Sequence, residues 1–155
     1  MTSEHTVNGV RHAGEIHFVH KETGGGNGVV VFAVFLETAV TSGSNQESNM
    51  APLNLWISDV WKSLGKVNQT VQVAYPYAEL LDQQIASGQV FNYPGSLTTP
   101  PCSEIVDWWV LGMPVKVSPN DLDNLSQQLH TREATDNGED ARPTQPLNGR
   151  TSIAY

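Results

Sequence analysis

The chain has five residues whose imidazole rings could bind a metal ion: His5, His12, His17, His20 and His130. Residues 15–20 read EIHFVH, and their alternation predicts a β-strand. On a strand, Glu15 and His17 share a face, where the carboxylate can accept one ring N–H and orient the other ring nitrogen toward a metal. His20 points to the opposite face, so His17 and His20 cannot share an ion. The spacing makes His17 a candidate metal ligand, and the alternative is an ordinary polar pair on one face.

Residues 97–101 read LTTPP and contain the second candidate for chemistry. A threonine fixed between a carboxylate and a hydroxide could select the lone pair that attacks a substrate, provided that a metal and an acid lie within reach. The alternative is a pair of hydroxyls that cap a loop. The glycine run at 24–28 precedes a predicted strand instead of a helix, so it is not a phosphate-binding loop.

The elements that must position these side chains are mostly strands. Strands are predicted at 15–20, 29–36, 67–74 and 104–111, the last with a possible extension at 115–117. Helices are predicted at 53–64, at 79–86 and from Pro119 to about His130, with Ser118 as N-cap. Residues 21–28, 41–52 and 90–101 read as turns or loops. The pattern predicts one mainly β domain with a few short helices.

Composition excludes several partners. The chain has 155 residues, 39% hydrophobic and 15% charged, with a formal charge of −8. An acidic balance repels nucleic-acid phosphates, so nucleic acid is not an expected partner. The longest apolar run, 29–36, is far shorter than the roughly 20 residues of a membrane helix. The first residues lack a basic region followed by an apolar stretch, so we expect a soluble domain with no signal peptide in this chain.

Five motifs in order resemble the α-type carbonic anhydrases: SEHT at 3–6, EIHFVH at 15–20, YPGSLTTPP at 93–101, the strand from Glu104 through Trp108, and RPTQPLNGR at 142–150. The resemblance spans nearly the whole chain but covers only about three-fifths of the family's domain. It implies a central, mostly antiparallel sheet with the N-terminal part of the domain missing, so residues 1–155 would form a partial, C-terminal domain.

The resemblance also implies roles for individual residues. His17 matches one of the family's three zinc-binding histidines, and Glu15 matches the carboxylate that orients it. Thr98 matches the hydroxyl that donates to Glu4 and orients the attacking hydroxide. The pocket for carbon dioxide would be lined by Val19, Val31, Leu97, Thr99, Val106 and Trp108. The implied reaction is the zinc-dependent, reversible hydration of carbon dioxide to bicarbonate.

In the family the other two zinc ligands would lie upstream of Met1. One imidazole cannot hold zinc in a three-ligand site, so we expect the isolated chain to be inactive. The alternative is a non-catalytic binding module built on the same scaffold.

The single cysteine, Cys102, cannot form an internal disulfide. By itself it reads as a buried thiol, whereas it resembles the cysteine that extracellular family members bridge to an N-terminal partner. With the sequons at Asn68 and Asn124, this favours a secreted or extracytoplasmic parent.

Overall fold

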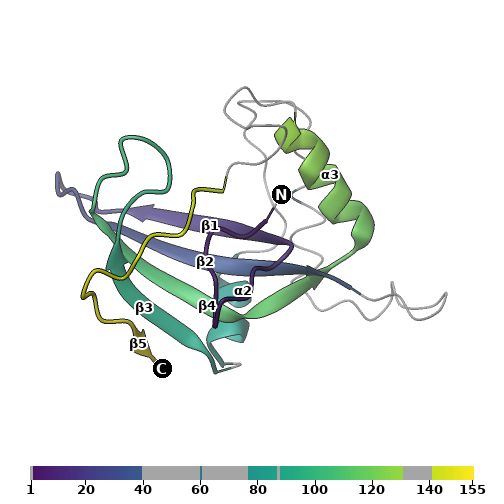
Figure 1. Cartoon of the computed structure of the whole chain (residues 1–155), viewed down its shortest axis with the longest axis horizontal. Coiled ribbons are helices and arrows are strands. Elements are labelled where there is room, and N and C mark those ends of the chain that lie inside the picture. Colours follow the sequence, from purple (N-terminus) through teal and green to yellow (C-terminus); the bar gives the residue numbers. More distant parts are fainter. Residues whose placement is uncertain (1, 40–59, 61–76, 87, 131–140) are drawn as a thin grey trace.

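The computed structural model describes residues 2–39, 60, 77–86, 88–130 and 141–155. Its centre is a five-stranded sheet in the order β1-β2-β4-β3-β5 (Figure 1). The strands are β1 (Gly14–Lys21), β2 (Val29–Thr38), β3 (Val90–Gly95), β4 (Val106–Val117) and β5 (Ile153–Ala154), and the helices include α2 (Tyr77–Ala86) and α3 (Pro119–His130). Only β2 and β4 pair in parallel, and the other three pairings are antiparallel. The expected mainly β fold with a mostly antiparallel sheet is therefore confirmed.

The first two strands form the predicted hairpin. Gly24 and Gly25 in its connection have φ values of 102° and 93°, a region that side chains other than glycine rarely adopt. β2 consists largely of β-branched and aromatic residues, and it lies between β1 and β4, as expected of a strand that is buried on both faces. The hairpin register pairs His17 with Ala33, which fixes where the candidate ligand lies on the sheet.

The two predicted segments around Pro114 join into one strand, β4. The pairing with β2 advances from Val34 opposite Leu111 to Leu36 opposite Val115, so four residues of β4 span two of β2. Pro114 lies inside this irregular stretch, where its missing N–H interrupts no regular ladder.

The prediction of a turn-dominated segment over 90–101 was wrong in its first half, because Val90–Gly95 forms β3. Pro94 suggested a turn, yet β5 pairs with β3 only at Phe91 and Asn92. Pro94 therefore lies beyond the paired part of that outer edge, where a proline is tolerated in a strand.

Ser118 caps α3 as predicted. Its Oγ accepts a hydrogen bond from the Asp121 backbone N–H at 3.1 Å and donates to Asp121 Oδ2 at 2.8 Å. Leu125 of α3 and Leu81 of α2 belong to the same core cluster as Val34 and Leu111, so both helices cover the same side of the sheet.

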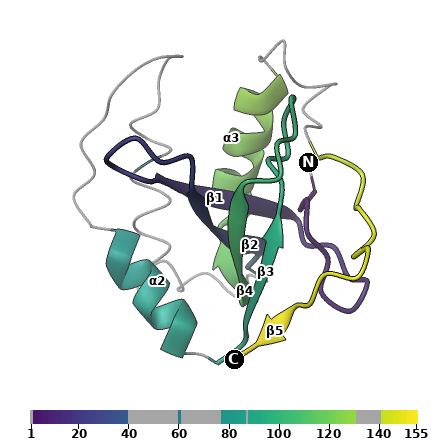
Figure 2. The same cartoon turned by 90° about the vertical axis from the view of Figure 1, so that its left-hand side faces the viewer.

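The opposite side is called here the site face, and it carries Glu15, His17, Val19, Val31, Ala33, Phe35, Trp108 and Val110. Figure 2 shows α2 on one side of the sheet, with the N-terminal segment and residues 141–152 on the other. The helix predicted at 53–64 and the strand at 67–74 lie outside the described residues, apart from Val60. None of the described helices has the length and apolar character needed to cross a membrane.

Candidate active site

The N-terminal segment is held against the site face by a tight turn and a buried serine. Asn8 and Gly9, with φ of 52° and 77°, form a two-residue turn closed by hydrogen bonds between Val7 and Val10. Ser3 is fully buried, and its Oγ accepts from the backbone N–H of His12 and donates to the carbonyl of His5. These contacts place residues 4 and 5 beside the middle of β1.

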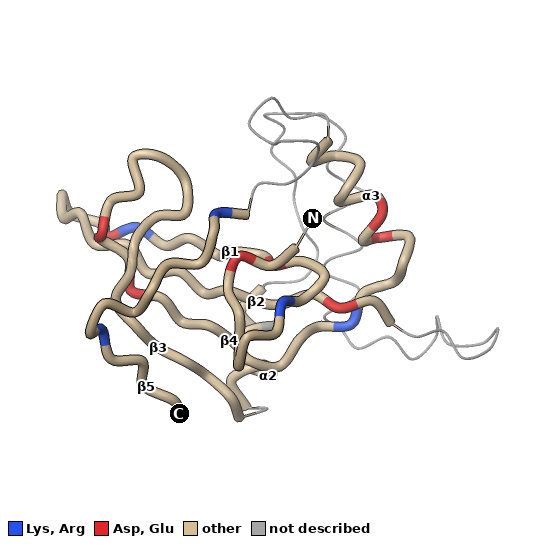
Figure 3. Tube along the Cα trace, viewed as in Figure 1, with Lys and Arg blue, Asp and Glu red and all other residues tan. Residues whose placement is uncertain are grey.

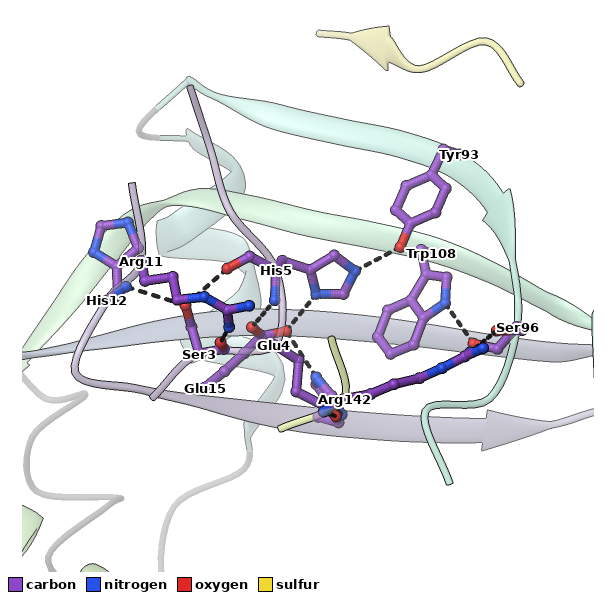
Figure 4. Close-up of polar contacts among 11 residues, drawn as sticks. Ser3, Glu4, His5, Arg11, His12, Glu15, Tyr93, Ser96, Trp108 and Arg142 are labelled. Atoms are coloured by element: carbon purple, nitrogen blue, oxygen red, sulfur yellow. Dashed lines mark hydrogen bonds and ion pairs between the residues drawn. The ribbon is translucent and has the colours of Figure 1, made fainter. Parts of the chain in front are cut away.

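Glu15 of β1 is the centre of the polar cluster on this face (Figure 4). Its Oε2 accepts from the His5 backbone N–H at 2.8 Å, while its Oε1 lies 2.5 Å from His5 Nδ1 and 2.7 Å from His17 Nε2. The Glu15 side chain is only 2% exposed. Burial alone would raise the pKa of this carboxyl, but the hydrogen bonds from His17 and His5 outweigh it and lower the pKa to about 2. The buried carboxylate therefore stays ionised and acts as an acceptor for both rings.

This arrangement sets the tautomer of His17. Because Nε2 donates to an ionised carboxylate, the neutral ring carries its proton on Nε2 and leaves the lone pair on Nδ1. Nδ1 lies 3.7 Å from Glu4 Oε2, too far for a hydrogen bond. The ring packs edge-on against Trp108, with centroids 4.9 Å apart. His17 is thus an oriented imidazole whose second nitrogen remains available to a ligand.

Two members of this cluster were not predicted as site residues. His5 bridges Glu15 and Tyr93, since its Nε2 accepts from the Tyr93 hydroxyl at 2.6 Å. Burial raises the pKa of Tyr93 to about 12, against an opposing effect from Arg150, so the phenol keeps the proton that it donates. His5 is ten residues from Glu15 and 88 from Tyr93, and no local periodicity connects such positions. The only signal in the sequence was the presence of both residues in two of the five family motifs.

Comparisons with known proteins agree with this geometry. A sequence model of the eukaryotic-type carbonic anhydrases matches residues 1–154. The chain belongs to this carbonic anhydrase family. It is 34% identical over 161 residues to carbonic anhydrase 5A, mitochondrial, of Rattus norvegicus, covering 96% of this chain and 49% of that relative. It is 32% identical to carbonic anhydrase 6 of Homo sapiens, covering 96% and 48%.

Solved structures show the same fold. The α-carbonic anhydrase from Thermovibrio ammonificans, in complex with the inhibitor sulfanilamide, superposes with a TM-score of 0.72 at 30% identity and covers 97% of this chain and 57% of that one. A hyperthermostable carbonic anhydrase from a hydrothermal vent chimney gives a TM-score of 0.73 at 28% identity. The chain spans about half the length of the curated relatives named here.

Glu4 and Thr98, which the carbonic anhydrase resemblance pairs, line the same cavity. Glu4 Oε1 accepts from the Arg142 backbone N–H at 3.1 Å, which ties the 141–152 segment to the N-terminal segment. Within the part of the chain that the structure describes, no hydrogen bond joins the Thr98 hydroxyl to Glu4. The two residues therefore line one cavity without the expected hydrogen bond between them.

The residues expected to line a carbon dioxide pocket occupy two environments. Val31, Val106 and Trp108 are at most 3% exposed and form one apolar cluster with Leu97 packed against it. Val19 on β1 is 54% exposed, and Thr99 is exposed in the loop after β3. The structure thus provides an apolar wall on the site face and leaves Val19 exposed at its margin.

One group of three possible metal ligands, His5, Glu15 and His17, is present among the described residues. Two ligands of a tetrahedral zinc lie about 3.3 Å apart for bonds of about 2.0 Å. Both rings approach one Glu15 oxygen at 2.5 and 2.7 Å, which are hydrogen-bond distances. This group therefore orients His17 instead of enclosing an ion.

The remaining histidines do not complete a zinc tripod around His17 Nδ1. All five histidines lie in the described ranges. His12 Nδ1 contacts Glu37, His20 lies on the helix side of the sheet against Tyr77, and His130 binds the carbonyl of its own helix at Ser126. The described residues thus fit zinc through one imidazole only.

Proposed function

We propose that this chain contributes one zinc ligand and the apolar wall to a site for zinc-dependent, reversible hydration of carbon dioxide to bicarbonate. The observation that carries the proposal is the Glu15–His17 pair. The buried carboxylate holds the proton on Nε2 and leaves Nδ1 free on the site face. Zinc, when bound, would lower the pKa of a coordinated water to about 7, the value that the family itself exemplifies.

Each residue would have one task. His17 Nδ1 would hold the metal, and Glu15 would keep the ring in the required orientation and tautomer. The Thr98 hydroxyl, by donating to Glu4, would orient the attacking oxygen. Val31, Val106 and Trp108 would form the wall against which carbon dioxide lies, with contributions from Val19, Leu97 and Thr99. A non-polar substrate requires such a wall because it offers few strong hydrogen bonds.

We further propose that the 155-residue chain alone neither holds stoichiometric zinc nor hydrates carbon dioxide. A catalytic zinc site needs three protein ligands, and His17 is the one suitable imidazole among the described residues. Two more imidazoles would have to come from polypeptide outside this sequence.

Two preparations test the proposal. The purified 155-residue chain is assayed for zinc by elemental analysis and for carbon dioxide hydration by stopped-flow. The second preparation carries an N-terminal extension, read in frame from its gene, that supplies two histidines. We expect little zinc and no hydration from the first preparation. The second should contain zinc and hydrate carbon dioxide, and His17→Ala in this preparation should abolish the bound zinc and the activity. Stoichiometric zinc and activity in the 155-residue chain would contradict the single-ligand assignment. Full activity of the His17→Ala variant would contradict the role of His17 as a zinc ligand, and absence of zinc and hydration from the extended preparation would contradict the function.

A further inference from the structure

A cavity of about 510 Å³ lies between the N-terminal segment, β3, β4 and the 141–152 segment, and it shares Glu4, Thr98 and Trp108 with the proposed hydration site. Neither His17 nor Glu15 lines it, so its lining does not include the proposed zinc ligand. Its volume falls within the range typical of small-molecule sites. The cavity is therefore a candidate binding site whose lining could hold a ligand without a metal.

Two arginines, Arg142 and Arg150, line this cavity and provide its positive charge. Figure 3 marks the Lys and Arg positions of the described chain in blue. Figure 4 shows the Arg142 side chain extending toward Ser96, whose Oγ accepts from Nη1 at 3.1 Å. Among the described residues, Nε and Nη2 of Arg142 donate no hydrogen bond. These are neighbouring donors of a planar fork, the geometry that binds a carboxylate through two parallel hydrogen bonds.

Arg150, the second guanidinium at this cavity, is already occupied. Its Nε, Nη1 and Nη2 donate to the carbonyls of Leu147, Pro94 and Pro146 at 2.8–3.2 Å. Its role is to fix the 146–150 turn against β3, and its charge adds to the local field. Each of the three nitrogens of Arg150 thus forms a hydrogen bond, whereas on Arg142 Nε and Nη2 form none among the described residues.

The rest of the lining is divided between apolar surface and hydroxyls. Phe91, Trp108, Val110 and Leu147 form an apolar wall. Thr6, Thr98, Thr144 and Ser152 also line the cavity, and in the described part of the chain their hydroxyls form no hydrogen bonds. Glu4 is the one acidic residue of this lining, and its Oε1 is occupied by the Arg142 backbone N–H.

We propose that this cavity binds a small monocarboxylate with an apolar body. The carboxylate pairs with the free donors of Arg142, and the body lies against Phe91, Trp108 and Val110. A bare oxyanion fills little of this volume and leaves the apolar wall uncovered, which selects against inorganic anions. The net charge of −8 opposes non-specific anion binding, so saturable binding would require this local arrangement.

The test uses the 155-residue chain in the presence of a chelator, which prevents anions from coordinating zinc. Amide NMR shifts are followed during titration with benzoate, benzyl alcohol and formate. We expect saturable binding of benzoate, with shifts in β3, β4 and residues 141–152. Benzyl alcohol lacks the charge and formate lacks the apolar body, so each should bind at least about tenfold more weakly.

Arg142→Gln should weaken benzoate binding by about tenfold or more, because a charge-assisted pair is lost. Arg142→Lys keeps the charge but loses the fork and should fall between Gln and the parent. Lys116→Gln, which removes an exposed cation of β4 outside the cavity, should leave the affinity unchanged.

The proposal is overturned if benzoate shows no saturable shifts, if benzyl alcohol or formate equals it, or if either Arg142 variant retains the parent affinity. Should Arg142→Gln not fold, the Arg142→Lys comparison decides. Since no metal takes part, the outcome is independent of whether the chain supports carbon dioxide hydration.

Discussion

Replacing Glu15 by glutamine tests the polar cluster most severely. In the folded chain the pKa of Glu15 falls from its ordinary 4.5 to about 2. That difference corresponds to about 3 kcal/mol of folding free energy. Because the folded pKa is the lower one, this stability is present above pH 4.5 and is lost as the pH falls toward 2. Glutamine offers one acceptor oxygen where three donors converge, so one donor would face its amide N–H₂.

We expect Glu15→Gln to lower the free energy of unfolding at pH 7 by about 2–4 kcal/mol, measured by urea denaturation. Its stability should also fall less steeply between pH 5 and 3 than that of the parent. The matched control is Glu37→Gln, which alters a carboxylate 3.0 Å from His12 whose side chain is 41% exposed. That change should cost less than about 1 kcal/mol. The reasoning is refuted if the two variants are equally stable, or if Glu15→Gln keeps the parent's acid dependence.

Three further changes test neighbouring contacts. Tyr93→Phe removes the hydroxyl that donates to His5 and should cost about 1–2 kcal/mol at pH 7. Because the folded pKa of Tyr93 is raised to about 12, the stabilisation by this phenol is complete below pH 10 and is lost between pH 10 and 12. The urea midpoint of Tyr93→Phe should therefore fall less than that of the parent over this range. Ser118→Ala removes the cap of α3 and should cost about 1 kcal/mol in the same assay. Phe35→Ala empties a fully buried position of β2 and should cost about 3–5 kcal/mol, seen as a lowered thermal midpoint.

Sequence periodicity predicted those parts of the structure that depend on neighbours along the chain. The β1–β2 hairpin, the shared face of Glu15 and His17, and the cap at Ser118 all arise from residues close in sequence. β3 was missed because Pro94 indicates a turn. A proline is tolerated at this position because β5 pairs with β3 only at Phe91 and Asn92.

The remainder of the cluster depends on tertiary contacts. His5 meets Tyr93 across 88 residues, and Glu4 meets Arg142 across 138. No residue spacing encodes such pairs, so only the family motifs indicated which positions to consider. Conversely, the expected contact between Thr98 and Glu4 does not form among the described residues, which keeps the role of Thr98 a prediction.

The central claim is that Glu15 holds the His17 ring with its proton on Nε2 and its lone pair on Nδ1. Nitrogen-15 NMR of the imidazole in the metal-free chain, at a pH where the ring is neutral, measures this directly. We predict a protonated Nε2 and an unprotonated Nδ1 for His17. A ring with its proton on Nδ1, or an equal mixture of tautomers, would contradict the account, since no oriented metal ligand would then exist.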